Sequence, residues 1–501
     1  MNESIERAVI ISMMRLCNIS SNRLLILQFT RRLAHCSDQS IATRFPAMLS
    51  NFFATSAVVT ALVATSATAD NSSFSFQSFA TKTAYWDQRD SAATFTWEAN
   101  ACGGETPVQA SDLELLQVQQ VSRHGSRFPT TDNTQEIMDL LDLLQTNYSS
   151  GIPDWMKDYS LPYNLTVQGN LAPAGAEELV AYGERSRTSV GSSFPTTYNA
   201  SLFKLAHTYK SRTADSAIAY ERPLSDTTFS FASTFFDNLD DVEYIEYSSD
   251  SVGDLLLRFF DMCDRYNEEV VDNSTAIPEL DAYDVSSKIN DSIAFMKAQL
   301  NLPDDASLSL TDVQAAFSAC AFDVTLYDIT DNWCSLVDQE FLNRMEYAED
   351  IESFYEQGAG YKINYEIAAV LLQDIYAYMK NFTTGDTTIV GNLRFGHAET
   401  TLPLMTLLGY GDRTPLLASW TDEQINSRGF RTSALAAMAS NIDFRLYQGK
   451  TDQKYYVSVW IQEIQAALPG CGDELYCELS KVEELWDYYL NDYDFDAECA
   501  V

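Results

Sequence analysis

Strand-like and helix-like patterns of hydrophobic positions follow one another along most of this chain. Five segments show the apolar run or the two-residue alternation of β-strands: residues 113–121, 203–209, 387–395, 441–447 and 455–461. Between them, apolar residues at helical spacing predict helices over 174–187, directly after Pro173, and around 367–378. Alternating strands and helices are typical of an α/β sheet.

The pattern changes between about Leu224 and Gly360. Here acidic and apolar stretches alternate with few strand-like runs, which predicts a mostly α-helical insertion over residues 224–360. The α/β domain would then comprise residues 70–223 and 361–501.

The first 69 residues differ from the rest of the chain. Residues 1–47 contain six arginines and no lysine, and we expect them to be a dispensable extension, upstream of the true start codon or, less favoured, an Arg-rich targeting peptide. Residues 48–69 hold a short apolar run before Ala67-Thr68-Ala69, the pattern of a secretory signal peptide. No run reaches the roughly 20 residues that span a bilayer, so we expect no transmembrane helix.

Composition and charge narrow the classes of partner. With 501 residues and 46% hydrophobic content, the chain can bury a large core. A formal net charge of −39 and a pI near 4.2 repel nucleic acid and anionic membrane surfaces, so neither is an expected partner. The charge also has a simpler explanation, the solubility of a secreted protein. An anionic substrate would therefore need a locally basic pocket.

Two further features favour export. Asn-x-Ser/Thr sequons recur after the expected cleavage site, at Asn71, Asn147, Asn164, Asn199, Asn273, Asn290 and Asn381. Seven cysteines follow that site without zinc-like spacing, which favours disulfides over metal ligation. Because seven is odd, at least one thiol stays free or pairs between chains. We expect a secreted glycoprotein.

Only three histidines follow residue 69. His124 and His397 come directly after predicted strands and beside glycine, and reactive groups gather at the carboxyl ends of strands in open α/β sheets. His207 shares a strand face with Leu205 and Tyr209, which indicates a core histidine. The first two are therefore the candidates for chemistry.

The segment 123–129 reads Arg-His-Gly-Ser-Arg-Phe-Pro. It resembles the Arg-His-Gly-x-Arg-x-Pro signature of the histidine acid phosphatases, a coincidence of about one in ten thousand for a random chain of this length. The resemblance implies that His124 attacks phosphorus while Arg123 and Arg127 hold the phosphate oxygens. Gly125 would let the backbone pass close to the phosphate. Alternatively, Arg123-His124-Gly125 is an exposed basic turn whose histidine has no function. This alternative does not explain why further residues of the family's site occur later in the sequence.

Those partners appear in the order that the family requires. Arg212 resembles the third phosphate-binding arginine, and Lys210 beside it would extend the basic pocket or be a solvated surface residue. The segment 393–400 contains His397-Ala398-Glu399, whereas most of the family has His-Asp at this point. In this motif the chain resembles the multiple inositol polyphosphate phosphatases. His397 would add a donor to the phosphate clamp. Glu399 would be the general acid, a role compatible with that of a carboxylate at a helix N-terminus.

The likeness covers about residues 113–447 and is looser over 224–340. It implies a doubly wound, mostly parallel sheet flanked by helices, as in phosphoglycerate mutase, with a smaller helical inserted domain. It also implies three disulfides and leaves Cys102 over: Cys320 with Cys334, Cys471 with Cys477, and Cys263 with Cys499. The C-terminus lacks a retention tetrapeptide, which favours secretion.

The expected reaction is a two-step phosphoryl transfer through a phosphohistidine, with no metal or other cofactor and a mildly acidic optimum. Inositol polyphosphates such as phytate are the expected small-molecule substrates. Three alternatives stay open: a broad acid phosphatase, a mutase of the same fold, and a non-catalytic secreted glycoprotein.

Overall fold

The computed structural model describes residues 78–85, 108–221, 235–236, 242–248, 253–472 and 474–501. The predicted extension, the predicted signal peptide, Asn71 and Cys102 lie outside the described residues. Among the described residues, no helix is both long enough and apolar enough to cross a bilayer. The six sequon asparagines within them are all exposed.

A mixed β-sheet contains all five predicted strands. The described strands are β1 (Leu113–Arg123), β2 (Phe203–Thr208), β3 (Tyr244–Tyr247), β4 (Gly391–Gly396), β5 (Asn441–Gly449), β6 (Tyr455–Ile461), β7 (Ile464–Ala466) and β8 (Cys477–Glu478). Their order is β3-β2-β4-β1-β5-β6-β7, and β8 pairs with β6. The β1, β2, β3 and β4 strands are parallel, whereas β5 and the strands beyond it pair antiparallel. The parallel part is thus one half of the sheet. In the other half, the short β5–β6 and β6–β7 connections leave no room for a crossover, so these strands pair antiparallel.

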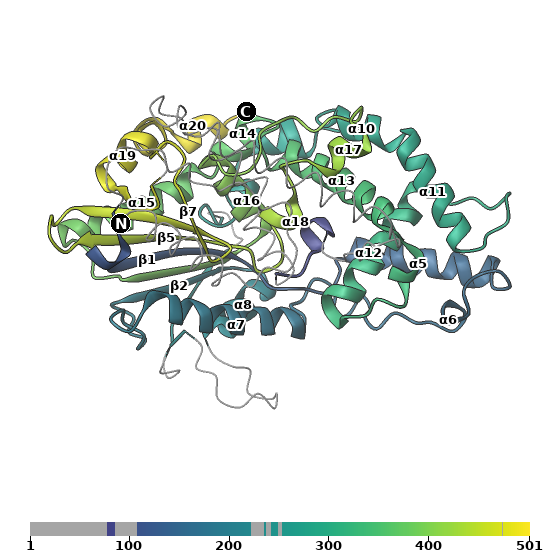
Figure 1. Cartoon of the computed structure of the whole chain (residues 1–501), viewed down its shortest axis with the longest axis horizontal. Helices are drawn as coiled ribbons and strands as arrows, with labels where there is room; N and C mark the ends of the chain where they lie inside the picture. The colour runs from purple at the N-terminus through teal and green to yellow at the C-terminus, as the bar shows by residue number, and fades with distance from the viewer. Residues whose placement is uncertain (1–77, 86–107, 222–234, 237–241, 249–252, 473) are drawn as a thin grey trace, which may run out of the picture. The chain divides into compact units, whose positions relative to one another are not determined.

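Helices cover both faces of this sheet, as a doubly wound fold requires (Figure 1). On one face, α7 (Pro173–Val190) and α8 (Ser211–Glu221) pack against β2 and β4, where Leu179 and Tyr182 meet Leu205 and Leu393. On the other face, α15 (Ala369–Thr384), α16 (Ala398–Leu407) and α19 (Leu479–Asp487) pack against β1, β5 and β6. Because helices cover both faces, seven consecutive residues at the end of β1 are buried, although only Val118 and Val121 among them are apolar.

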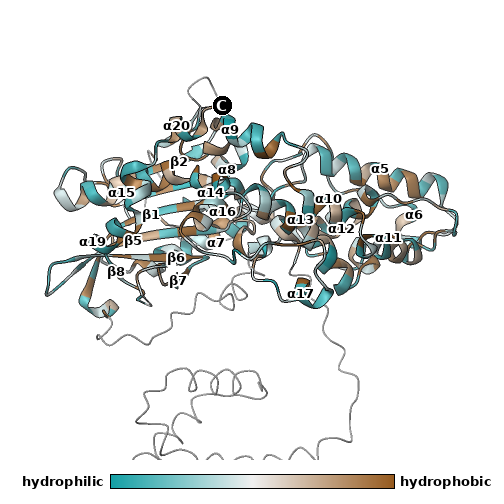
Figure 2. Ribbon diagram, turned by 90° about the horizontal axis from the view of Figure 1, so that it is seen from above, coloured by the Kyte–Doolittle hydropathy of each residue, from teal (hydrophilic) through white to brown (hydrophobic). Residues whose placement is uncertain are grey.

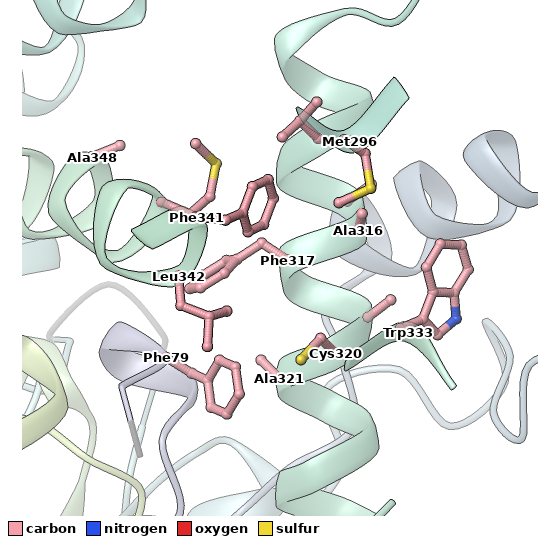
Figure 3. Packing of buried hydrophobic residues seen from close by; sticks show 14 of the residues in the cluster. Phe79, Met296, Ala316, Phe317, Cys320, Ala321, Trp333, Phe341, Leu342 and Ala348 are labelled. Carbon is pink, nitrogen blue, oxygen red and sulfur yellow. The ribbon is translucent and has the colours of Figure 1, made fainter. Parts of the chain in front are cut away.

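A cluster of helices lies beyond the end of the sheet at which β1 ends (Figure 2). It comprises α5 (Thr131–Asn147), α6 (Asp154–Lys157), α10 (Pro278–Asp284), α11 (Ser287–Gln299), α12 (Leu310–Tyr327) and α13 (Gln339–Glu356). Its centre is α12, which is buried on most sides; Figure 3 shows Phe317 of this helix beside Phe341 and Leu342 of α13. The composition of α12 suits a central helix: its small alanines let the neighbouring helices approach closely, and its phenylalanines fill the space between them.

The helical cluster is not formed by the same residues as the predicted insertion. Helices α10 to α13 fall within residues 224–360, but β3 in that range joins the sheet. Conversely, α5 and α6 precede the predicted insertion, and Ile137, Leu140 and Leu144 of α5 pack in the same core as α12. The cluster is therefore built from two separate segments of the chain.

The remaining described helices are short. They are η1 (Ala80–Lys82), η2 (Ala110–Asp112), η3 (Phe259–Met262), α9 (Asp264–Tyr266), η4 (Asn267–Val271), η5 (Trp333–Leu336), α14 (Lys362–Glu366), α17 (Asp422–Asn426), α18 (Thr432–Leu435), η6 (Tyr488–Asp492) and α20 (Phe495–Cys499). Three disulfides are present with the pairing that the resemblance implies: Cys263–Cys499, Cys320–Cys334 and Cys471–Cys477.

A buried ion network fixes the position of α13. The Arg428 guanidinium lies 2.6 Å from carboxylate oxygens of both Glu346 and Asp350, and all three side chains are inaccessible to solvent. Arg431 pairs with Glu346 as well, at 2.7 Å. Removing one partner would leave an uncompensated buried charge, so the network holds α13 firmly against the segment after α17.

Candidate active site

The register of the parallel strands brings the two candidate histidines together. β1 and β4 are neighbours, and Arg123 at the end of β1 lies opposite Gly396 at the end of β4. The next residue on each strand is His124 and His397, and their ring centroids are 5.6 Å apart with the planes at 71°. The sheet thus places two side chains from remote parts of the sequence at one edge.

Backbone contacts fix the loop that follows β1. The His124 amide donates to the Gly396 carbonyl at 3.0 Å, and the Ala439 amide donates to the His124 carbonyl at 2.9 Å. A Cβ on Gly125 would lie 2.3 Å from the carbonyl oxygen of Gly175 in α7. Glycine is therefore required here for the loop to pack against α7, which differs from the reason that the sequence suggested, a close approach to phosphate.

The His124 ring is held in one tautomer. Its Nδ1 lies 2.8 Å from the Gly125 carbonyl oxygen, which can only accept a hydrogen bond, so Nδ1 carries the proton and Nε2 carries the lone pair. Burial, followed by the nearby Arg123 and Arg212, places the pKa of His124 well below its usual value. The surroundings thus favour the neutral imidazole, which has a lone pair on Nε2 available for attack.

Three guanidinium groups line a cavity of about 220 Å³ together with His124: those of Arg123, Arg127 and Arg212. Arg123 is anchored by the carbonyls of Thr81, at 2.7 Å, and Ala436. Burial and the charge of Arg127 lower the pKa of Arg123 to about 9, and burial and Arg212 lower that of Arg127 to about 10. Three cations that destabilise one another in a buried cavity form a site for a multiply charged anion.

His397 holds Arg212 in place. Its Nδ1 lies 3.3 Å from Nη2 of Arg212, which can only donate, and its Nε2 lies 3.0 Å from the hydroxyl of Thr208. Nδ1 therefore accepts from the arginine and Nε2–H donates to Thr208. Burial and Arg212 place the pKa of His397 well below its usual value, so this ring is neutral too. Its expected role as a donor to phosphate stays a prediction.

Glu399 lies in the first turn of α16 and lines the same cavity. Its charge stabilises the protonated forms of Arg123, Arg127 and Arg212. The carboxyl group thus lines the cavity together with the three guanidinium groups. This position is compatible with both roles that the sequence suggested, a general acid and a carboxylate at a helix N-terminus.

Three side chains considered from the sequence, those of His397, Lys210 and His207, are not part of the lining of this cavity. The ammonium group of Lys210 lies over the Tyr209 ring, 4.6 Å from its centroid. His207 is buried, and its Nδ1 lies 2.8 Å from the Thr208 carbonyl oxygen, as expected of a core histidine.

Sequence reasoning missed several residues around the cavity. Glu178 of α7 accepts hydrogen bonds from the Ser126 amide, at 2.7 Å, and the Ser126 hydroxyl, at 2.8 Å, and so orients the loop after β1. One face of α13 and the residue after it also line the cavity, with Glu349, Glu352, Ser353, Glu356 and Gln357. Their three- and four-residue spacing identifies a helix face, but no single-sequence signal tells which surface that face meets.

The acidic face of α13 makes anion binding sensitive to pH. Burial and the neighbouring Glu352 raise the pKa of Glu356 to about 7, so this carboxyl group ionises between pH 5 and 8. We expect the inhibition constant of inorganic sulfate, which does not titrate in this range, to rise several-fold from pH 5 to 8 as the carboxyl group ionises. In Glu356→Gln the rise should be smaller. Glu340→Gln, which removes an exposed carboxylate of the same helix, is the control, and an equal rise in both variants would refute the assignment.

A larger, open hollow of about 1120 Å³ lies between α15 and α19. Its lining contains one lysine, Lys380, which pairs with Glu483 at 2.5 Å. Because it gathers neither histidines nor free cations, the cavity at the strand ends is the candidate active site.

Comparisons with known proteins agree with this placement. Residues 114–462 match the Histidine phosphatase superfamily (branch 2). Multiple inositol polyphosphate phosphatase 1 of Homo sapiens is 30% identical over 376 residues, which cover 69% of this chain and 74% of the human protein. A thiamine-repressible acid phosphatase of Schizosaccharomyces pombe is 23% identical over 403 residues, 75% of this chain and 82% of that protein. The crystal structure of the phytase from D. castellii shares the fold, with a TM-score of 0.65 and 18% identity over 80% of this chain and 84% of that chain.

Proposed function

Because this chain belongs to branch 2 of the histidine phosphatase superfamily and is a phosphoric monoester hydrolase, we propose that it removes phosphate from inositol polyphosphates through a phosphohistidine. The observation that carries the proposal is the position of neutral His124 among three buried guanidinium groups. Phosphoryl transfer to a side chain requires a nucleophile and positive charge that binds the phosphate. A neutral imidazole already has a lone pair and needs no separate general base, and the guanidinium groups supply the charge.

In the first step, the lone pair on Nε2 of His124 attacks phosphorus, and the bond from phosphorus to the alcohol oxygen breaks. Protonated Glu399 gives its proton to that oxygen, so the alcohol leaves neutral. The charges of Arg123, Arg127 and Arg212 stabilise the negative charge that spreads over the equatorial oxygens. In the second step, water attacks the phosphohistidine, Glu399 takes a proton from the water, and the bond from nitrogen to phosphorus breaks to release phosphate and neutral His124.

Two observations bear on the substrate. The relative with 30% identity is named a multiple inositol polyphosphate phosphatase, and this chain carries His397-Ala398-Glu399. The acidic face of α13 favours a second candidate, a broad acid phosphatase, because Glu352 and Glu356 would repel further phosphate groups on that side. The acid phosphatase relative is in line with this alternative.

Secretion is part of the proposal. It is supported by the apolar run before Ala67-Thr68-Ala69, by the three disulfides, which form in oxidising compartments, and by the exposure of the described sequon asparagines.

One experiment tests both the proposed substrate class and secretion. Protein is purified from the culture medium, and its turnover of phytate and of p-nitrophenyl phosphate is measured. We expect kcat/KM for phytate to exceed that for p-nitrophenyl phosphate by at least about ten-fold, and a chelator to leave both unchanged because arginines supply the positive charge. The N-terminus of this protein is expected at Asp70. A higher kcat/KM for p-nitrophenyl phosphate would favour the broad acid phosphatase, and protein retained in the cells would refute secretion.

A further inference from the structure

A second group of cations lies beside His397, outside the lining of the catalytic cavity. The Arg258 guanidinium and the Lys210 ammonium both lie over the ring of Tyr209, at 5.3 Å and 4.6 Å from its centroid. Arg258 also lies 4.9 Å from the ring centroid of Phe260. Both cations are therefore placed by the same aromatic ring.

The backbone around Arg258 is tied to the catalytic segment. The Thr400 hydroxyl donates to the Leu257 carbonyl at 2.6 Å, and the His397 amide donates to the same hydroxyl at 3.0 Å. On the other side of Arg258, the Phe260 ring meets the His397 ring edge-on at 6.5 Å. Contacts on both sides therefore fix Arg258 relative to His397.

Arg258 and Lys210 retain donors for a ligand. Nε of Arg258 donates to Asp261 at 2.5 Å, but its Nη1 and Nη2 donate to no residue within the part of the chain that the structure describes. The Arg258 side chain is 13% exposed, so this free edge is partly shielded from water. No carboxylate among the described residues forms an ion pair with Lys210.

The electrostatics agree with the geometry. Arg258 and Lys210 are among the charges that lower the pKa of His397, and Arg258 also lowers that of Arg212. Arg258 therefore adds positive potential at both His397 and Arg212, and Lys210 adds it at His397. The cavity is thus flanked by cations next to His397 and by carboxylates on the α13 side.

We propose that Arg258 and Lys210 form a second phosphate subsite, which binds another phosphate group of the alcohol whose scissile phosphate lies in the clamp. The subsite rests on the proposed function, since it discriminates substrates only if they carry more than one phosphate. Arg258 would present its Nη1–Nη2 edge and Lys210 a point charge to the same anion. Tyr209 positions both cations. An inositol polyphosphate would then enter with its additional phosphates toward Tyr209 and away from α13.

The test compares Arg258→Gln with the wild type on phytate and on p-nitrophenyl phosphate, which has a single phosphate. We expect the ratio of KM for phytate to KM for p-nitrophenyl phosphate to rise about ten-fold. Arg258→Lys keeps the charge and should give an intermediate ratio. Arg265→Gln, which removes an exposed arginine of α9 that pairs with Glu269, is the matched control and should leave the ratio unchanged.

The outcomes separate the subsite from the substrate class. Turnover of p-nitrophenyl phosphate reports that each variant is folded. An unchanged ratio in Arg258→Gln, with phytate a good substrate of the wild type, would overturn the subsite alone, as would equal increases of both KM values. A wild type that hydrolyses p-nitrophenyl phosphate but not phytate would overturn both the subsite and the inositol polyphosphate proposal.

Discussion

Replacing His124 with alanine is expected to lower kcat for phosphate release at least about 1000-fold, because the variant lacks the only nucleophile in the proposed reaction. The loss should be the same for phytate and p-nitrophenyl phosphate, since the attacking nitrogen serves every substrate. Wild-type enzyme quenched during turnover of a ³²P-labelled substrate should carry label that is stable in alkali and labile in acid, as a phosphohistidine is. The variant should carry none.

His207→Asn is the matched control for this experiment. It removes a buried histidine that lies outside the cavity lining, so kcat should stay within about three-fold of the wild-type value if the variant folds. Undiminished activity of His124→Ala would remove the basis of the mechanism and would favour a non-catalytic protein or a different nucleophile. Labelled wild type that yields no phosphohistidine would contradict the two-step path.

Glu399→Gln is expected to lower kcat for phytate about 100-fold, because an inositol alkoxide is a poor leaving group unless it is protonated. p-Nitrophenolate leaves without a proton, so its first turnover should be nearly as fast as in the wild type. If Glu399 also activates water in the second step, the phosphohistidine accumulates, and rapid mixing would show a burst of nitrophenol equal to the enzyme concentration.

The contrast between leaving groups makes this prediction specific to a general acid. A variant that merely weakens the clamp would slow the first turnover of both substrates alike, and that result would assign Glu399 a structural role at the start of α16. Glu340→Gln, on the exposed end of α13, controls for the loss of one negative charge and should show neither effect.

The family, the fold class and five residues of the cavity lining could be predicted from the sequence because short contiguous motifs carry them: Arg123, His124, Arg127, Arg212 and Glu399. Arg123, His124 and Arg127 lie within five consecutive residues, and a buried strand followed by glycine already indicated the carboxyl end of a sheet. The strands with long apolar or alternating patterns were also predicted. By contrast, β3, β7 and β8 span two to four residues each, too few for a period to be recognised.

What could not be predicted depends on which surfaces meet. The apolar positions of α5 have helical spacing, but nothing in that spacing says that they join the core around α12. Arg258 lies in a loop without a motif, and its place beside His397 follows from contacts of its neighbours, the hydrogen bond from Thr400 to Leu257 and the ring contact of Phe260 with His397. The same holds for the carboxylates of α13. Their spacing identifies a helix face, but it does not show that this face lines a cavity together with the arginines.

The position of β1 between β4 and β5 has a consequence for biosynthesis. During translation the segment that bears His124 emerges from the ribosome long before either neighbour exists, since both are encoded near the far end of the chain. The apolar side chains of β1 therefore stay exposed while the whole helical cluster is synthesised. During that time they can associate with other chains or bind chaperones. A catalytic centre in this arrangement is completed only at the end of synthesis, so a nascent chain has no phosphatase activity until the sheet closes around it.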